Sequence, residues 1–145
     1  MQMQRGVTLL ELMMVGTVLA ILAAIAVPSY RQYLLRANRS DAKTALMQMQ
    51  AAQEKFYLQN NEYTDKILVA PPTGLGMTET TSHGFYKLRV ELKKVGDVAA
   101  QGFKAFATPV LGAGQSDDKK CDEFSIDDAG KKEATGSLGD IACWK

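Results

Sequence analysis

The stretch RGVTLLELMMVGTVLAILAAIAVPSY, residues 5–30, decides how the rest of this sequence is interpreted. No residue from 12 to 30 is charged. An uncharged helix of that length spans roughly 28 Å, close to the ~30 Å hydrocarbon core of a bilayer. Glu11 stands at the head of the run, where an ionised side chain costs ~2.5–3.5 kcal/mol unless a partner compensates it. The stretch therefore predicts a membrane-inserted helix whose Glu11 needs a positive partner.

The first residues combine a basic head with a small residue that precedes the apolar run. Arg5 and Gly6 stand before the run, whereas an ordinary secretory signal has its small-residue cleavage site after an apolar core of ~7–15 residues. Cleavage after Gly6 would leave the apolar helix on the mature protein. The residues alone leave two interpretations open, an uncleaved single-pass anchor oriented by Arg5 or a processed anchor.

The junction RGVTLLELMMV resembles the leader junction of type IV pilins and the related pseudopilins: a short basic leader, Gly, then a hydrophobic helix with Glu five residues beyond the Gly. The resemblance implies that prepilin peptidase cuts after Gly6 and methylates the new terminus at Val7, where most family members have Phe. It also implies that the carboxylate of Glu11 neutralises the terminal amine of a neighbouring subunit in the filament. Pairing with the amine of its own chain is the alternative.

Length and charge limit the remaining possibilities. The chain has 145 residues, which suit one domain with a modest core. Its 17 basic and 16 acidic residues give a formal charge of +1, so no long-range field attracts nucleic acid or anionic lipid. A strongly basic DNA-binding module is excluded.

Helical periodicity continues beyond the apolar run. Pro28 is expected to bend or locally break the helix, because proline lacks an N–H and clashes with the preceding turn. One helix is expected from about residue 8 to residue 58. Spacings of three and four predict a core-facing stripe of Ala42, Ala45, Leu46, Met49, Ala52 and Phe56. The opposite, polar face is predicted to carry Arg36, Arg39, Lys43, Gln50 and Lys55.

The second half of the chain has the pattern of a loop followed by strands. Residues 60–84 are rich in Asn, Pro, Gly and Thr and predict a long loop. FYKLRVEL (85–92) alternates polar and apolar residues, and GFKAFATPV (102–110) repeats the pattern. CDEFSIDDAGKKEAT predicts a third strand, a turn at 128–130 and a possible fourth strand. An antiparallel sheet laid across the helix would bury both apolar faces.

Cys121 and Cys143 are the two cysteines of the chain. In a domain outside the cytoplasm they favour a disulfide, which would contribute ~3 kcal/mol in the chain-entropy model. Type IV pilins similarly close their C-terminal region with a disulfide. Trp144 is expected to pack on the sheet edge. A zinc site needs about four ligands, and the lone His83 stands in the predicted loop far from either cysteine, so no metal or other cofactor is expected.

No catalytic constellation is recognisable, so an enzyme is not expected. The pairs Asp117–Asp118 and Asp127–Asp128 lack the alternating spacing of a calcium loop and are interpreted as solvated turns. The lysine pairs 93–94, 119–120 and 131–132 could form a DNA-contacting face. Scattered solvated lysines are the preferred interpretation in a neutral protein, so nucleic acid is not an expected partner.

The predicted fold is therefore α+β, the type IV pilin fold: a long N-terminal helix packed on a small antiparallel β-sheet with a disulfide-closed C-terminal region. Residues 1–6 form the leader peptide, 7–30 the hydrophobic membrane and filament-core helix, and 31–145 the globular head. The stretch NRSDAKTALMQMQAAQEKFYLQNNEYT and the terminal CW most resemble the minor pilins of the PilE kind.

The resemblance implies a structural subunit of a type IV pilus, serving pilus biogenesis, twitching motility or adhesion. Its expected partners are other pilin subunits, prepilin peptidase and the inner-membrane assembly machinery. It would lie in the bacterial inner membrane with its head in the periplasm before assembly, and in the extracellular pilus afterwards. Two alternatives stay open. A type II secretion pseudopilin would be favoured by absence of the 121–143 bridge, and a DNA-uptake pilin by salt-sensitive DNA binding.

Overall fold

The computed structural model describes residues 8–93 and 100–145. The chain divides into two compact units, Met1–Leu34 and Leu35–Lys145. Helix α1, Leu9–Asn60, contributes to both units. The predicted single long helix is thereby confirmed.

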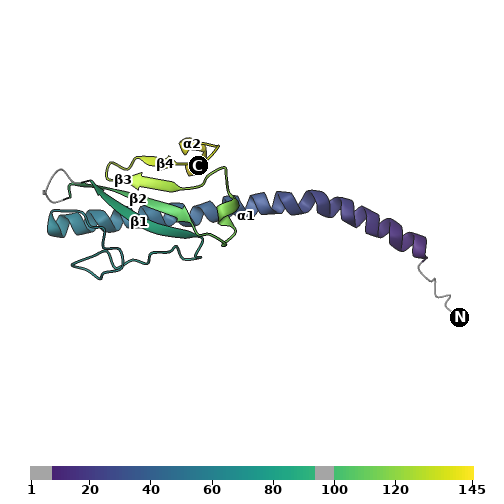
Figure 1. The fold of residues 1–145 in the computed structure, drawn as a ribbon, viewed down its shortest axis with the longest axis horizontal. Helices are drawn as coiled ribbons and strands as arrows, with labels where there is room; N and C mark the ends of the chain where they lie inside the picture. Colours follow the sequence, from purple (N-terminus) through teal and green to yellow (C-terminus); the bar gives the residue numbers. More distant parts are fainter. Residues whose placement is uncertain (1–7, 94–99) are drawn as a thin grey trace. The chain divides into compact units, whose positions relative to one another are not determined.

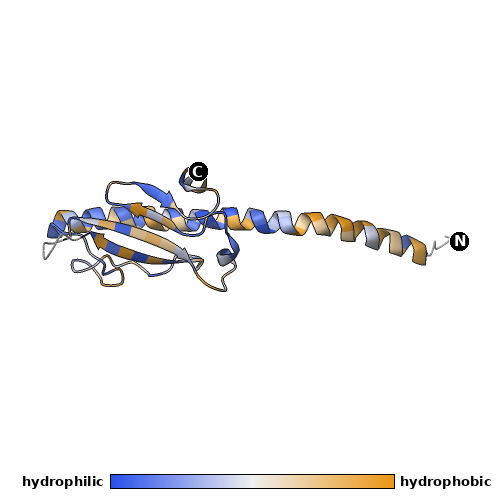
Figure 2. Cartoon of the chain, turned by 45° about the horizontal axis from the view of Figure 1, so that its top comes forward, coloured by the Kyte–Doolittle hydropathy of each residue, from blue (hydrophilic) through white to orange (hydrophobic). Residues whose placement is uncertain are grey.

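The first unit consists of the N-terminal part of α1, which is hydrophobic over most of its length (Figure 2). Its large apolar side chains from Leu9 to Val27 are 51–76% exposed. Among the described residues, α1 is the one helix with the length and composition to cross a membrane. An apolar surface of this extent requires lipid or other apolar helices around it.

Pro28 lies inside α1 without interrupting it. The hydroxyl of the next residue, Ser29, donates to the carbonyl of Ile25 at 3.0 Å, which uses a carbonyl of the turn that proline disturbs. A local break is therefore not observed. A change of helix direction at Pro28 stays a prediction.

The end of α1 is set by two asparagines. Asn61 has a φ of 58°, in the left-handed region, and its N–H donates to the carbonyl of Tyr57 at 2.7 Å. Asparagine tolerates this conformation better than most residues, so it serves as a C-terminal cap where a glycine is common. Asn60, the last helical residue, donates from its side chain to the carbonyl of Phe56.

The second unit contains a four-stranded antiparallel sheet laid over α1 (Figure 1). The strands are β1 (Tyr86–Lys93), β2 (Gly102–Pro109), β3 (Phe124–Asp127) and β4 (Lys132–Ala134), in the order β1-β2-β3-β4. All four strands were predicted. Along β1 the buried and exposed residues alternate as the sequence indicated. The turn between β3 and β4 is closed by the N–H of Gly130, which donates to the carbonyl of Asp127 at 2.9 Å.

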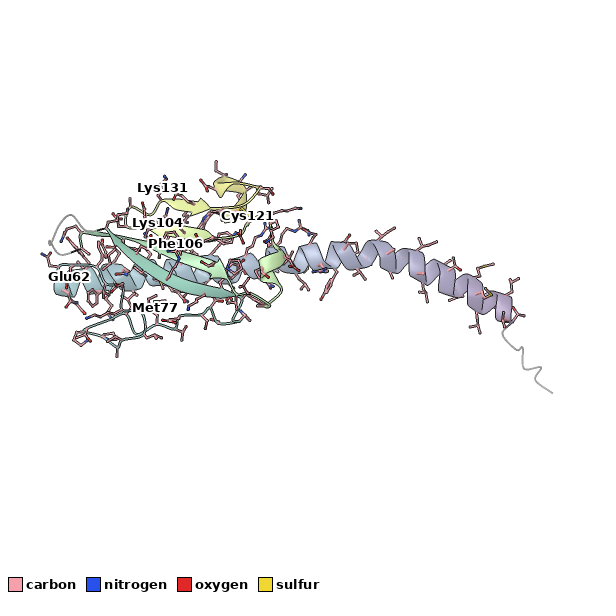
Figure 3. All side chains as sticks on the ribbon, viewed as in Figure 1. Glu62, Met77, Lys104, Phe106, Cys121 and Lys131 are labelled. Carbon is pink, nitrogen blue, oxygen red and sulfur yellow. A yellow bond between two sulfur atoms is a disulfide. The ribbon has the colours of Figure 1, made fainter. Side chains whose placement is uncertain are left out.

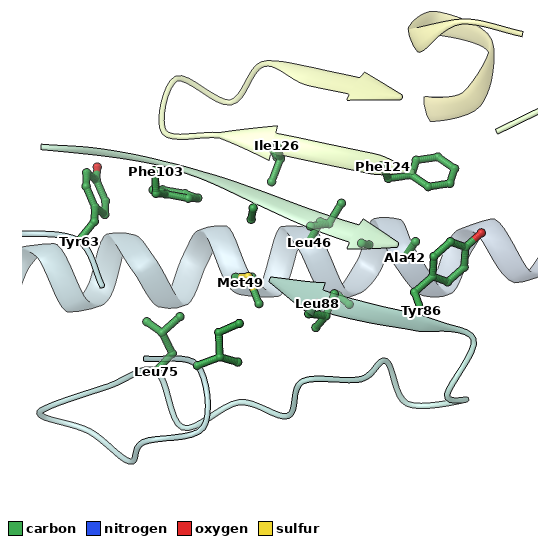
Figure 4. Packing of buried hydrophobic residues seen from close by; sticks show 14 of the residues in the cluster. Ala42, Leu46, Met49, Tyr63, Leu75, Tyr86, Leu88, Phe103, Phe124 and Ile126 are labelled. Atoms are coloured by element: carbon green, nitrogen blue, oxygen red, sulfur yellow. The ribbon is translucent and has the colours of Figure 1, made fainter. Parts of the chain in front are cut away.

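The hydrophobic core lies between α1 and the sheet (Figure 4). The predicted helical stripe is confirmed, with Ala52 partly buried and the other five members buried. Facing it are buried side chains of the strands, among them Leu88, Phe103, Ala105, Ala107, Phe124 and Ile126. Each large side chain removed from water in this way contributes ~1.5–3 kcal/mol, so the core accounts for the packing of the helix on the sheet.

The prediction that Arg39 lies on the polar face of the helix is wrong. Arg39 is 5% exposed and faces the second unit's interior. Position 39 lies three and seven residues before Ala42 and Leu46, so helical geometry extends the buried stripe back to it. A charged side chain occupies this place because an acidic partner, Asp118, compensates it.

The C-terminal region is closed as predicted by a disulfide between Cys121 and Cys143. The short helix α2, Asp140–Trp144, covers the outer edge of β4. The indole N–H of Trp144 donates to the carbonyl of Glu133 at 2.9 Å, and the carboxylate of Asp140 accepts from the N–H of Ala134 at 2.7 Å. These side chains satisfy edge groups that would otherwise invite pairing with another chain. The expected contact of Trp144 with the sheet edge is confirmed.

Candidate functional site

The N-terminus of α1 carries the first candidate site. The hydroxyl of Thr8 accepts a hydrogen bond from the N–H of Glu11 at 3.2 Å. The backbone carbonyl of Thr8 accepts one from the N–H of Leu12 at 3.2 Å. Thr8 therefore caps the helix, and Thr8-x-x-Glu11 has the spacing of a capping box. This cap is an addition to the role predicted for Glu11, and its spacing was present in the sequence. Gly6 and Val7, the predicted cleavage and methylation positions, lie outside the described residues.

The outer face of the sheet carries basic side chains that are bonded to carboxylates. Lys93 lies 2.6 Å from Asp128, while Lys104 and Lys131 each lie 2.5 Å from Glu133. Figure 3 shows Lys104 and Lys131 with Phe106 on this part of the molecule. Hydrogen bonds from Lys104 and then Lys131 lower the pKa of Glu133 to about 2. The positive charge of these lysines is therefore largely neutralised within the chain.

An aromatic ring lies among these charges. The guanidinium of Arg89 stacks over the ring of Phe106, 3.6 Å from its centroid, and also contacts Glu91 and Glu123. The same Glu123 accepts a hydrogen bond from Thr108 at 2.6 Å. Phe106 is 9% exposed, so its ring is covered and does not offer a surface on which a nucleic acid base could stack.

The connection between β2 and β3 holds a buried ion pair. Nε and Nη2 of Arg39 donate to the two carboxylate oxygens of Asp118 at 2.7 and 2.9 Å. The interpretation of Asp118 as part of a solvated turn is therefore wrong. Its side chain is 1% exposed. Sequence reasoning missed the pair because its members are 79 residues apart, with no local pattern that joins them.

Three lysines near the disulfide have no carboxylate partner in the described part of the chain: Lys119, Lys120 and Lys132. Lys119 donates to the carbonyl of Ser116 at 2.9 Å, and the ammonium of Lys132 lies 5.2 Å from the centroid of the Trp144 ring. Lys119 also lines a groove of about 900 Å³ beside this loop. The predicted lysine pairs therefore differ in their ion pairing. In the pairs 93–94 and 131–132, Lys93 and Lys131 are bonded to carboxylates, whereas, among the described residues, neither lysine of the pair 119–120 is. Lys94 lies outside the described residues.

His83 also has a partner that the sequence did not reveal. Its Nδ1 lies 3.1 Å from Oδ1 of Asp41, which ties the 61–85 connection to α1. The imidazole is 72% exposed. Within the described residues, no three His, Cys, Asp or Glu side chains come together as a set that could hold a metal ion.

Comparison with known proteins places these features in a family. The family model described as "Type IV minor pilin ComP, DNA uptake sequence receptor" matches residues 28–125. The type IV major pilin protein PilA of Myxococcus xanthus is 41% identical over 73 residues, which cover 48% of this chain and 33% of that protein. A fimbrial protein of Neisseria meningitidis serogroup B is 36% identical over 100 residues, covering 68% of this chain and 55% of that protein. The chain spans between a third and just over half of the length of such relatives.

A solved structure, the non-core minor pilin PilV of Neisseria meningitidis, aligns with 73% of this chain and 91% of its own at a TM-score of 0.49 and 17% identity. The long apolar helix, the four-stranded sheet and the C-terminal disulfide define a type IV pilin. Within that class, the chain belongs to the family of the type IV minor pilin ComP. The bridge is present, so the absence that would have favoured a secretion pseudopilin is not observed.

Proposed function

We propose that this pilin is a structural, minor subunit of a type IV pilus. Prepilin peptidase removes residues 1–6 by cutting between Gly6 and Val7 and methylates the amine of Val7. Residues 7–30 then hold the protein in the bacterial inner membrane, with the head (31–145) in the periplasm, until the assembly machinery moves it into the extracellular filament. The head serves pilus biogenesis, twitching motility or adhesion and has no catalytic role.

The observation that carries this proposal is the exposure of the apolar side chains between Leu9 and Val27. Lipid covers such a surface before assembly, and the apolar helices of neighbouring subunits cover it in a filament. The carboxylate of Glu11 lies on the first turn of this same helix. In this proposal it pairs with the Val7 amine of a neighbour in the filament, and with its own Val7 amine before assembly.

The first prediction concerns processing and incorporation together. We expect the chain to be recovered in the sheared pilus fraction with a methylated Val7 at its N-terminus, as measured by mass spectrometry. Gly6→Val is the matched control: a β-branched side chain obstructs the extended backbone at the cleavage point, so this variant stays uncut and in the membrane. Recovery of the unaltered chain in pili with residues 1–6 attached would contradict the proposal, as would normal cutting of Gly6→Val.

A second function is favoured by the description of the matching family model, which names a DNA uptake sequence receptor. We propose that the head binds DNA, and that Lys119, Lys120 and Lys132 supply the phosphate contacts. The support is their lack of a carboxylate partner within the described residues, in contrast to Lys93, whose charge two aspartates neutralise. This revises the expectation that nucleic acid is not a partner.

The second prediction tests this with the full mature chain in detergent micelles and a fluorescent DNA duplex. Each lysine–phosphate contact contributes ~0.9 to the slope of log affinity against log salt concentration. Lys119→Gln/Lys120→Gln should therefore lower the slope by about 1.8 and weaken binding roughly tenfold at low salt. Lys93→Gln/Lys131→Gln removes the same formal charge from paired lysines and should change affinity less than about twofold. Equal losses in both double variants, or no binding by the unaltered chain, would refute this site.

A further inference from the structure

The carboxylate of Asp118 organises the loop that carries two of these lysines. Oδ1 of Asp118 accepts the backbone N–H of Lys120 at 3.3 Å and that of Cys121 at 3.4 Å. Oδ2 accepts from the side-chain amide of Gln115 at 3.3 Å. One buried carboxylate thus binds two backbone N–H groups that follow it in the chain and one side-chain amide that precedes it, in addition to its two bonds with Arg39.

The loop is fixed to α1 at two points. Arg39 holds Asp118, and the amide of Gln115 also donates to the carbonyl of Leu35 at 3.1 Å. Gln115 is fully buried, and Asp118 is only 2% exposed. The lysine loop therefore takes its position from the helix through side chains that solvent does not reach.

A further set of contacts fixes the backbone of the lysines themselves. The carbonyls of Lys119 and Lys120 accept the N–H groups of Ser137 and Leu138 at 3.1 and 3.0 Å. Gly136 lies so close that a Cβ there would stand 2.5 Å from the carbonyl oxygen of Lys120. Both carbonyls and the N–H of Lys120 are thus bonded inside the protein, which restrains this backbone, while both side chains stay exposed.

We propose that Asp118, itself held by Arg39, is a positioning residue that presents Lys119 and Lys120 as a pre-ordered pair to the phosphates of DNA. The inference rests on the DNA-binding function proposed above. Binding groups that are already ordered lose less conformational freedom when they bind, and affinity rises accordingly. Asp118 acts through the backbone of the two lysines and makes no contact with the nucleic acid.

The direction in which DNA affinity changes when Asp118 is replaced distinguishes a positioning role from a purely electrostatic one. A carboxylate beside two lysines reduces the local positive potential, so removing its charge should on that ground alone strengthen binding to a polyanion. Loss of a positioning residue should weaken it. Asp122 provides the matched control, because it is a half-buried aspartate of the same loop, whereas the N–H groups of Lys120 and Cys121 donate to Asp118.

The test compares Asp118→Asn and Asp122→Asn in the full mature chain, using the same DNA duplex and temperatures at which both variants are folded. We expect Asp118→Asn to weaken binding about threefold or more and Asp122→Asn to leave it unchanged or tighter. Arg39→Lys, which retains the charge and loses the two-pronged geometry, should fall between the unaltered chain and Asp118→Asn. In NMR spectra, the amide resonances of Lys120 and Cys121 should shift in Asp118→Asn and stay in place in Asp122→Asn.

Tighter binding by Asp118→Asn, or equal effects of the two aspartate substitutions, would overturn the positioning role while leaving the lysine site intact. Unchanged Lys120 and Cys121 resonances in Asp118→Asn would overturn it as well. Failure of the unaltered chain to bind DNA refutes the DNA-binding function and with it the purpose assigned to the loop. The amide resonances then still decide whether Asp118 orders the lysine backbone.

Discussion

Glu11→Gln is expected to be cut after Gly6 and retained in the membrane at normal levels, yet to be lost from the sheared pilus fraction. The substitution preserves size and removes the charge. Membrane insertion should improve if it changes at all, because an ionised group has left the apolar segment. Cutting should continue, because the peptidase recognises the leader side of the junction. An incoming subunit would have to bury its Val7 amine without a counter-charge, at a cost of a few kcal/mol per subunit.

Glutamine is the informative replacement because residue 11 also belongs to the helix cap. Its N–H donates to the hydroxyl of Thr8, in a capping-box spacing that accepts either Glu or Gln. Glu11→Gln therefore keeps the cap and alters only the charge. Thr8→Val is the complementary control, since it removes the capping hydroxyl at nearly constant shape, costs the helix ~1 kcal/mol and leaves the carboxylate in place.

The two proposed roles for Glu11 make opposite forecasts. If charge pairing with Val7 drives assembly, Glu11→Gln loses incorporation and Thr8→Val retains most of it. If the carboxylate serves only the helix terminus, Glu11→Gln is harmless and Thr8→Val is the more damaging change. Immunoblots of the sheared pilus and membrane fractions, with mass spectrometry of the N-terminus, decide between them. Normal incorporation of correctly cut Glu11→Gln would end the pairing argument.

Arg39→Met is expected to produce the largest loss of head stability among single substitutions of charged side chains on α1. It leaves the carboxylate of Asp118 buried without its counter-charge, which costs ~3–5 kcal/mol. For a unit of the size of Leu35–Lys145, that corresponds to a fall in the thermal midpoint of more than about 10 °C. Thermal unfolding of the full chain, followed by near-ultraviolet circular dichroism, measures the shift.

Two comparisons show whether the ion pair is the cause. Arg39→Met/Asp118→Asn removes both charges together, so no unpaired charge stays buried and most of the lost stability should return. Arg36→Met changes an exposed arginine of the same helix and should cost no more than ~1 kcal/mol. A double variant as unstable as Arg39→Met would show that the loss comes from packing around the arginine stem instead of from the unpaired charge.

The fold was predictable because its determinants are local in the chain. The uncharged run after Glu11 needs only composition and length to indicate a membrane helix, and the strand 85–92 needs only its alternation. Spacings of three and four identified the buried helical stripe, and two cysteines in a domain expected outside the cytoplasm favoured the bridge that the structure contains. The resemblance at the leader junction gave the register of Gly6, Val7 and Glu11, whose roles stay predictions.

The contacts of charged side chains could not be predicted as well from the sequence. Arginine is usually found on the polar face of a helix, and aspartate is usually found in exposed turns. Arg39 and Asp118 were therefore both predicted to be exposed to solvent. Lys93 and Lys119 are indistinguishable as members of lysine pairs, although one is bonded to two aspartates and the other has no carboxylate partner in the described residues. The position of His83 opposite Asp41 likewise follows from no local pattern.

By itself, then, the sequence indicated an apolar helix, an amphipathic helix and an antiparallel sheet, because repeating patterns of hydrophobicity specify which faces are buried. The pilin family came from the resemblance at the leader junction, and the C-terminal bridge was expected from the two cysteines. Only the tertiary structure showed which charged side chains form ion pairs within the chain and which are exposed to solvent. Arg39 and Asp118 become partners across 79 residues because the packing of helix on sheet brings their segments together. Once desolvated, each charge is compensated by the other, and removing either side chain would leave a buried charge without its counter-charge.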